Sequence, residues 1–488
     1  MTTHEITTTA PAAEIALPSP PARSPLAALR RSRWAPLPIV LAGVFMVVLD
    51  FFIVNVALPS IQSSLHASGS SIEFVTAGYA LTSAVFLISG ARLGDRLGRR
   101  RMFCAGLALF TLASGACGIA GTAGELVAAR LVQGVAGAML MPNVLSVIAV
   151  AYTGEDRIKA LSWYGLSMGL AAVSGQLIGG LLVQWNPAGL GWRSCFLINV
   201  PIGALALALA PQLVRESRDP NASRVDWVGT VLVTLGLTAI VFPLVEGRQH
   251  GWPLWTWLSL GAAPALLSAF VLQQRGLSRG GRKPLLDLTL FRERAFSAGL
   301  LAQLVFWSGQ ASFFLVLALY MQEGRGMSPL HAGLVFTVLA ASYLAASMRA
   351  PALAVRYGRR VLTAAALTLA SGHLVLLIGV AVIGVHGSVA VLVPGLLLIG
   401  AGMGLAISPL ATIIMSTIRP EQAGAASGAL STFQNVGNAI GVAVIGVVFY
   451  GSLHGGFAVA LEWSLATLAV ILLGVAALTR LLPAKVRS

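Results

Sequence analysis

The sequence predicts an all-α membrane protein with fourteen transmembrane helices, and three observations support this class. Hydrophobic residues make up 57% of the chain and charged residues only 10%, whereas a soluble domain carries about 25% charged residues. Apolar runs of about 20 residues, the length that crosses a ~30 Å hydrocarbon core, follow one another along the chain. Lys and Arg gather in every second connection between these runs, as expected for connections that face the cytoplasm.

The fourteen spans are placed where apolar runs lie between polar connections. A segment rich in Thr, Ala, Pro and Ser precedes the first span, and this composition is typical of a disordered tail. A cleaved signal peptide is not expected, because the apolar run that follows is longer than a signal core. The expected spans cover residues 37–59, 72–92, 102–121, 125–149, 160–183, 194–214, 226–246, 254–274, 296–320, 330–350, 361–384, 388–413, 423–450 and 457–482.

The charges in the connections predict that both termini lie in the cytoplasm. With the N-terminus inside, 28 of the 32 Lys and Arg residues fall on the inner side, three fall outside, and Arg130 falls within a span. This distribution obeys the positive-inside rule. Adding or removing one span would move every later connection to the other side, so the charges also support the number fourteen.

Two stretches of the first half recur in the second half. A four-residue stretch that ends in Gly-Arg-Arg occurs at 97–100 and again at 357–360, and GVAGAMLMP (134–142) resembles AGMGLAISP (401–409). Parallel repeats of six spans are a transporter arrangement. We therefore expect two six-helix bundles with two inserted helices between them.

This repeat divides the chain into five parts. A short amphipathic segment at the membrane interface is also expected at 285–291, within the inserted part. The parts are a disordered cytoplasmic tail (1–33), an N-terminal bundle (34–214), two inserted helices with a basic cytoplasmic loop (215–294), a C-terminal bundle (295–482) and a cytoplasmic tail (483–488).

The same observations argue against several function classes. The net charge of +15 comes from short connections between apolar spans, so it indicates topology and attraction to lipid headgroups rather than a nucleic-acid partner. The sequence contains no GxxxxGK[ST] loop, no metal-ligand set and no nucleophile–base pattern. Cys104, Cys117 and Cys195 form no metal or disulfide pattern. We expect no enzyme, no cofactor and no metal.

Asp50 is the leading functional candidate because it is a carboxylate deep in the first expected span. It lies ~20 Å from the cytoplasmic side at ~1.5 Å per residue, and a charge at such a depth costs at least ~2.5–3.5 kcal/mol. Burial favours its neutral form and a nearby cation favours its charged form. Arg130, in the fourth span, lies at a similar depth and is the expected partner. The alternatives are a static carboxylate bonded to a neighbouring helix and an arginine that reaches the outer interface.

A charged turn between the second and third spans predicts a gate. Asp95 lies among Arg96, Arg99 and Arg100, with Gly98 between them. A carboxylate at the end of a span can pair with basic groups or a helix end in one state and release them in the other. For the arginines, topology alone is an equally good explanation.

Glycines and amides complete the set of candidates. Gly175, Gly179 and Gly180 in the fifth span permit close helix approach and predict either a hinge or ordinary packing. Glu73 and Asp226 begin spans, and we expect them at the membrane interface. Amide side chains that we expect to line a substrate cavity are Asn55, Gln133, Gln176, Gln310, Gln434, Asn435 and Asn438.

Five motifs in order give the chain a family resemblance that covers residues 37 to 482 and is strongest over 49–201. The chain resembles the fourteen-spanner drug:proton antiporter family of the major facilitator superfamily. The motifs are LDFFIVNVALP (49–59), ARLGDRLGRR (91–100), LVAARLVQG (126–134), GQLIGG (175–180) and WRSCFLINVP (192–201).

The resemblance implies a major facilitator fold and places the counterpart of Arg130 in the proton-coupling machinery. The sequence departs from the family pattern at Ala91, at Phe52 and at Gln176, which replaces the usual proline of the fifth-helix motif. This last change puts the kink expected in that helix in doubt, because proline kinks a helix by removing a backbone donor.

We therefore expect a multi-pass protein of the inner (plasma) membrane that works by alternating access. The expected function is proton-coupled efflux of small hydrophobic or cationic compounds, either drugs or self-made metabolites, by a monomer. Protons and the lipid bilayer are the other expected partners. The alternatives are a transporter of a polar nutrient or metabolite and, less favoured, a membrane sensor that does not transport.

Overall fold

The computed structural model describes residues 32–219, 225–282, 284–416, 418 and 423–482. Within these ranges, fourteen helices are long and apolar enough to cross a membrane, which confirms the predicted number. Most of them extend a few residues beyond the predicted limits. The predicted tails lie outside the described residues, apart from 32 and 33.

The described residues form sixteen α-helices. They are α2 (Pro36–Leu65), α3 (Gly69–Leu97), α4 (Arg99–Ile119), α5 (Ala123–Ala151), α6 (Gly154–Trp185), α7 (Ser194–Leu197), α8 (Asn199–Leu213), α9 (Trp227–Glu246), α10 (Leu254–Arg279), α11 (Arg294–Leu319), α12 (Pro329–Ser347), α13 (Ala350–Tyr357), α14 (Arg360–Ile383), α15 (Val393–Met415), α16 (Ala423–Ser452) and α17 (Phe457–Leu478).

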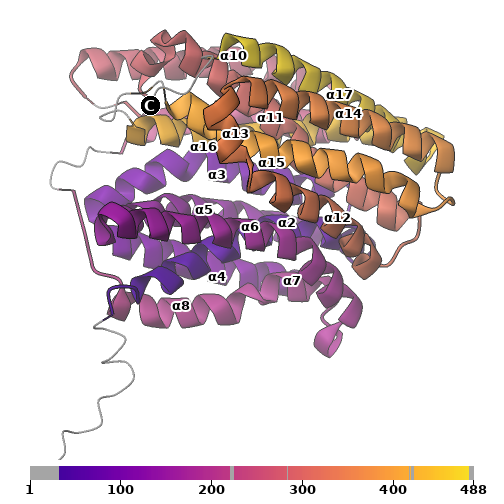
Figure 1. Cartoon of the computed structure of the whole chain (residues 1–488), viewed down its shortest axis with the longest axis horizontal. Helices are drawn as coiled ribbons and strands as arrows, with labels where there is room; N and C mark the ends of the chain where they lie inside the picture. The colour runs from indigo at the N-terminus through magenta and orange to yellow at the C-terminus, as the bar shows by residue number, and fades with distance from the viewer. Residues whose placement is uncertain (1–31, 220–224, 283, 417, 419–422, 483–488) are drawn as a thin grey trace, which may run out of the picture.

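Two six-helix bundles repeat one packing pattern (Figure 1). In the first, α5 packs on α3 and α4, and α2 packs on α6; in the second, α15 packs on α12 and α14, and α11 packs on α16. Glycine allows the closest approaches. A Cβ on Gly134 of α5 would lie 2.5 Å from the carbonyl oxygen of Tyr79, and one on Gly404 of α15 would lie 2.4 Å from that of Tyr343. The repeated sequence stretches therefore have equivalent places in the fold.

The inserted helices α9 and α10 pack against each other, and α9 contacts both bundles through α3 and α16. Asp226 joins the two inserted helices. It caps α9 by accepting a hydrogen bond from the backbone N–H of Gly229 at 2.9 Å, and it accepts another from Gln274 of α10 at 2.6 Å. Asp226 thus lies at the start of a span, as predicted, and its carboxylate also links α9 to α10.

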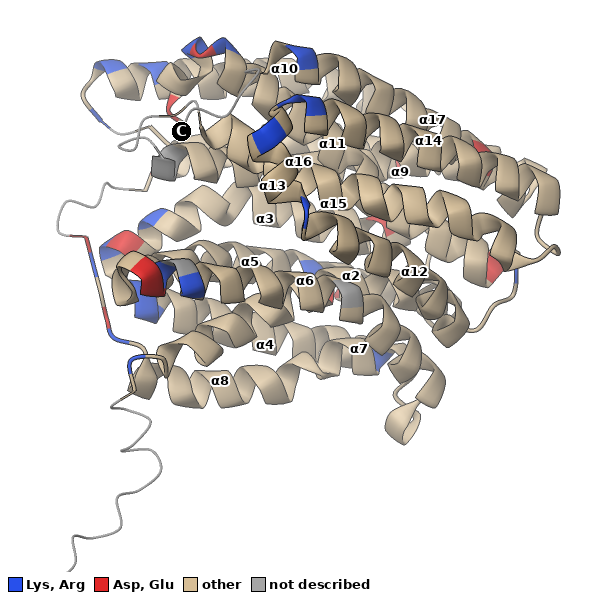
Figure 2. Cartoon of the chain, in the orientation of Figure 1, with Lys and Arg blue, Asp and Glu red and all other residues tan. Residues whose placement is uncertain are grey.

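Most of the basic residues lie at one end of the helix bundles, on the left in Figure 2. We call this end, which carries the connections 92–101 and 349–360, the arginine-rich end. The opposite end is called the distal end, and it carries Arg193, Arg248 and Arg325.

The two bundles meet closely at the distal end. Gly180 of α6 lies against α12, where a Cβ on this glycine would be 2.5 Å from the carbonyl oxygen of Pro329. The side chain of Gln322, just after α11, donates a hydrogen bond to the carbonyl oxygen of Val56 in α2 at 2.8 Å. Both contacts join the first bundle to the second, so the distal end is closed in this structure.

Helix α6 is exposed towards the arginine-rich end. In that half of the helix, Leu161 and Trp163 are 40% and 56% exposed. In the described part of the chain, a Cβ added at Gly165 or Gly169 would meet no atom of another helix within 4 Å. One helix therefore has a packed distal half and an exposed half towards the arginine-rich end.

Candidate functional site

Asp50 lies near the middle of α2 and is fully buried inside the first bundle. It forms an ion pair with Arg130 of α5, whose Nη1 donates to Asp50 Oδ2, and both side chains are 0% exposed. An uncompensated buried charge costs several kcal/mol, so each group needs the other to remain ionised here. The structure thus confirms the contact between Asp50 and Arg130 that was predicted from their similar depths.

Two amides and a hydroxyl complete the surroundings of the Asp50 carboxylate. Gln133 of α5 and Asn199 of α8 donate hydrogen bonds to Asp50 Oδ1 at 2.8 and 3.1 Å. The same two amides donate to the hydroxyl of Ser114 in α4 at 2.8 and 3.3 Å. The carboxylate accepts from three side chains, which is the pattern of an ionised acid. This network joins α2, α4, α5 and α8.

Arg130 also holds the neighbouring helix α3. Its Nε donates to the carbonyl oxygen of Val75 at 3.0 Å, and its guanidinium lies 4.3 Å from the centroid of the Tyr79 ring. Its Nη1 donates a second bond, to Gln133 at 2.7 Å. Loss of the charge on Asp50 would therefore leave Arg130 with a carbonyl, an amide and an aromatic face, which hold it in place but do not neutralise it.

Sequence reasoning did not select Asn199 or Ser114. Asn199 lies within the quoted motif at 192–201, and a polar side chain in an apolar span was the available signal. Ser114 had no distinguishing signal, because serine is common in packed membrane helices. Only the arrangement of the helices brings these two residues to the carboxylate.

Three of the amides expected at a substrate cavity bond to their own helices. Asn55, Gln310 and Asn435 each donate to the carbonyl oxygen four residues earlier, at 3.0, 3.4 and 3.0 Å. Asn55 and Gln310 are buried, and Asn435 is half-buried. None of these bonds reaches the Asp50 network.

The remaining amides are Gln176, Asn438 and Gln434. Both amide atoms of Gln176 and the Oδ1 of Asn438 are buried without a hydrogen-bond partner in the described part of the chain. Gln434 is half-buried on α16. Of the predicted cavity residues, the structure thus brings only Gln133 to Asp50. A role for the others in the substrate pathway stays a prediction.

The gate candidate Asp95 is paired within its own bundle. It accepts bonds from Nε and Nη2 of Arg99, one helical turn later, at 3.0 and 2.7 Å. Its backbone carbonyl accepts from the N–H of Asp219 at 2.9 Å. Arg96 is exposed. These contacts hold the α3–α4 connection against the segment after α8, and a gating role for it stays a prediction.

Glu216, in the segment after α8, is an acidic partner of this connection that sequence reasoning missed. Its carboxylate accepts from the backbone N–H groups of Arg100 and Arg101, the first turn of α4, at 3.1 and 3.2 Å. Gly98 has φ of +119°, and a Cβ there would lie 2.6 Å from the Glu216 carboxylate. Glycine is thus required for both the backbone conformation and the space. An acid in another connection on the same side, the one after α8, was the available signal.

The three predicted hinge glycines lie where α6 meets two other helices. Cβ atoms on Gly175 and Gly179 would be 2.9 Å from atoms of Phe52 and Ile53 on α2, and Gly180 faces α12. At these glycines, helix α6 therefore packs closely both on α2 of its own bundle and on α12 of the second bundle. This placement permits either of the predicted roles, hinge or packing.

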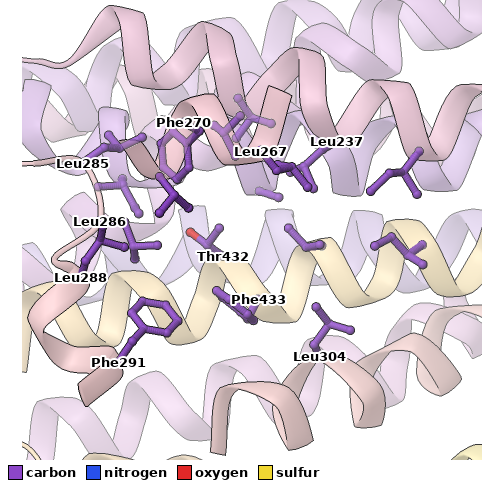
Figure 3. A pocket seen from close by; sticks show the side chains of 18 of the residues that line it. Leu237, Leu267, Phe270, Leu285, Leu286, Leu288, Phe291, Leu304, Thr432 and Phe433 are labelled. Atoms are coloured by element: carbon purple, nitrogen blue, oxygen red, sulfur yellow. The ribbon is translucent and has the colours of Figure 1, made fainter. Parts of the chain in front are cut away.

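A cavity of about 500 Å³ lies beside the bundle interface, between the inserted helices and α3 and α16 (Figure 3). Its walls are almost entirely apolar, and among the described residues Arg275 is the one charged side chain that lines it. Phe291, from the predicted amphipathic segment, contributes to this wall with Leu285, Leu286 and Leu288. That segment therefore packs into the protein as well as lying at its arginine-rich end.

The repeated bundles of apolar helices define an integral membrane protein with the arrangement of a transporter. Over the described ranges, no group of three or more His, Cys, Asp or Glu side chains could hold a metal ion. The chain belongs to the Major Facilitator Superfamily, whose family model matches residues 40–442. It is a multi-pass protein of the plasma membrane.

Named relatives include exporters. A probable actinorhodin transporter of Streptomyces coelicolor is 39% identical, with 86% of this chain and 73% of the relative covered. The multidrug resistance protein Stp of Mycobacterium tuberculosis is 35% identical, with 83% and 74% covered. The tetracenomycin C resistance and export protein of Streptomyces glaucescens is 32% identical, with 88% and 78% covered.

A crystal structure of the peptide transporter POT in complex with sulfate resembles this chain with a TM-score of 0.66. The alignment covers 93% of this chain and 97% of that chain, at 17% sequence identity. Such a low identity shows a common fold and nothing about the substrate.

Proposed function

We propose that this transporter exports small hydrophobic or amphiphilic molecules across the plasma membrane in exchange for protons, and that its arginine-rich end faces the cytoplasm. The functions named for its relatives, export and drug resistance, support the direction and the substrate class. The concentration of basic residues at one end supports the orientation, since positive connections stay inside.

The observation that carries the proton coupling is the fully buried Asp50–Arg130 pair. Protonation of Asp50 removes the negative charge that compensates Arg130 and one of the acceptor sites used by Gln133 and Asn199. The links among four helices would weaken together. A change of one proton can therefore alter the relative stability of two packings of the first bundle.

The coupling between proton and substrate is proposed to be indirect. Asp50 faces the interior of the first bundle, whereas the Phe52 ring of the same helix packs edge-on against Phe314 of the second bundle at 5.4 Å between centroids. A shift of α2 would thus reach the bundle interface without contact between Asp50 and substrate. Proton and substrate need only prefer different states of the carrier.

The closed distal end corresponds to an inward-facing state in this orientation. Helix α6 packs on α12 at the distal end and is exposed towards the arginine-rich end. Substrate would enter from the cytoplasm or the inner leaflet, and the apolar cavity beside α3 and α16 suits a hydrophobic molecule.

Transport in reconstituted vesicles tests this proposal. Purified protein is inserted into liposomes, a proton gradient is imposed, and the gradient-driven movement of ethidium, tetraphenylphosphonium and puromycin is followed. We expect Asp50→Asn to reduce gradient-driven flux by about 5- to 150-fold, the usual range of a coupling free energy. Substrate exchange without a gradient is expected to persist. Equal gradient-driven flux in the wild type and in Asp50→Asn would reject Asp50 as the proton carrier.

A further inference from the structure

A second buried carboxylate lies outside the Asp50 network. Glu73 is the fifth residue of α3, near the distal end, and its side chain is 1% exposed. Neither of its oxygens has a hydrogen-bond partner among the residues that the structure describes. Arg248 lies beside it, with Nη2 at 3.7 Å from Glu73 Oε1, beyond hydrogen-bond distance.

Three parts of the molecule meet at Glu73. The residue itself belongs to the first bundle, Gly446 and Tyr450 belong to α16 of the second bundle, and Arg248 belongs to the connection between the inserted helices. A Cβ on Gly446 would lie 2.4 Å from the Glu73 carboxyl carbon. The guanidinium of Arg248 lies 4.7 Å from the centroid of the Tyr450 ring. With the distal end closed, α16 thus lies directly on the carboxyl group.

The charged groups around Glu73 do not favour its ionised form strongly. Arg248 is a partly exposed cation without a hydrogen bond to the carboxylate. Glu246, at the end of α9, is a nearby anion that is 22% exposed and accepts a hydrogen bond from Ser70 at 2.9 Å. Burial of an ionised carboxylate without donors costs several kcal/mol, and a neutral carboxyl group avoids most of that cost.

We propose that Glu73 is a second proton-binding site, which takes up a proton from the external water when the distal end closes. The inference rests on the proposed function, because it uses the orientation with the distal end outside. When the distal end opens, α16 leaves the carboxyl group, water reaches it, and the proton returns to the external side. By linkage, external acid therefore favours the closed distal end. Glu73 adds no transported proton to those carried by Asp50.

The distance between two spin labels at the distal end measures this closure. Gly124 at the start of α5 and His386 between α14 and α15 are exposed at that end, and each is replaced by cysteine. Cys104 is replaced by serine, whereas Cys117 and Cys195 are buried and stay in place. Electron–electron double resonance then gives the populations of short and long distances at several pH values, without substrate or gradient.

The expected result is a long-distance population that grows as the pH rises in the wild type. Glu73→Gln is expected to lose this population at every pH, because its side chain stays neutral. Glu246→Gln is expected to keep a pH response but to move it to lower pH, because it removes a nearby anion that disfavours the charge on Glu73. A pH-independent distance in the wild type, or a wild-type response in Glu73→Gln, would overturn the proposal.

Two further variants keep the test decisive. Gly446→Ala places a methyl group against the Glu73 carboxyl group, so we expect a long-distance population even at acid pH; its absence would contradict the proposed contact. Asp50→Asn is expected to lose gradient-driven flux and to keep the pH response of the labels. Loss of the response in this variant would reject a separate site at Glu73, whereas unchanged flux would reject only the role of Asp50.

Discussion

Asp50 and Glu73 are both buried carboxylates of the first bundle, but their surroundings differ in kind. Asp50 accepts hydrogen bonds from Arg130, Gln133 and Asn199, all on helices of the same bundle. Glu73 accepts none among the described residues and lies where the first bundle, the second bundle and the inserted helices meet. Equal burial therefore leads to opposite preferences, since donors stabilise the charged form and their absence favours the neutral form.

This difference separates two tasks within one transporter. A carboxylate inside a bundle can change the packing of that bundle as it gains or loses a proton. A carboxylate between bundles responds to whether the bundles are in contact. We therefore assign the coupling of the transport cycle to Asp50 and the pH dependence of distal closure to Glu73.

Removal of the Asp50 carboxylate should have the largest effect on stability. Asp50→Ala leaves Arg130 buried without a counterion, so the free energy of unfolding is expected to fall by about 3–5 kcal/mol. Asp50→Ala combined with Arg130→Met removes both charges and should recover most of that loss. Thermal unfolding of the detergent-purified variants measures both changes. If the double variant is no more stable than Asp50→Ala alone, the uncompensated charge of Arg130 is not the cause of the lost stability.

Removal of the Glu73 charge should have the opposite effect and raise the free energy of unfolding. Glu73→Gln is expected to raise the stability at alkaline pH by about 1–3 kcal/mol, the cost of an unsatisfied buried polar group. At acid pH, where the wild-type side chain is neutral, the two proteins should unfold at the same temperature. The comparison of melting temperatures across pH checks this prediction. A loss of stability at alkaline pH would mean that Arg248 compensates the charge of Glu73.

A larger side chain at the helix contact of the distal end should destabilise that end, where Glu73 lies, and leave the hydrogen bonds of Asp50 unchanged. Gly180→Ala places a Cβ 2.5 Å from the carbonyl oxygen of Pro329, and such overpacking costs about 1–3 kcal/mol. Gly169→Ala on the same helix is the control, because its site is open, and it should gain about 0.4–1 kcal/mol. Melting curves and the distal label distance report the two effects. If the two variants behave alike, the distal half of α6 is not more tightly packed than the half towards the arginine-rich end.

The smallest effect is expected at Glu216, far from both carboxylates in the fold. Glu216→Gln weakens the cap of α4, which is worth about 0.5–2 kcal/mol, and should lower the melting temperature slightly at all pH values. Gradient-driven flux and the pH response of the distal end should remain those of the wild type. A large loss of flux would instead give the α3–α4 connection a part in gating.

The sequence predicted the fold well because the bilayer imposes strong rules. Span length and the side of each basic connection led to fourteen helices, and the repeat of 134–142 at 401–409 indicated two bundles. The depth of Asp50 and Arg130 in their spans was enough to predict their contact, since a buried charge requires a partner.

The sequence did not predict which helices surround each carboxylate. Asn199 and Ser114 reach Asp50 only because α4 and α8 pack beside α2 and α5. Glu73 was expected at the interface from its place at a span start, whereas α16 and the α9–α10 connection cover it. Whether a residue is covered in this way depends on contacts between segments far apart in the sequence. Composition and spacing do not predict such contacts.

Infrared difference spectroscopy tests the central claim most directly, because a protonated carboxyl group has its own C=O stretching band. We expect acidification of reconstituted protein to produce bands from both Asp50 and Glu73, and ethidium binding to diminish only one of them. That ethidium-sensitive band should be missing in Asp50→Asn but present in Glu73→Gln. A spectrum in which Asp50→Asn retains the band that responds to ethidium would contradict a proton carried by Asp50.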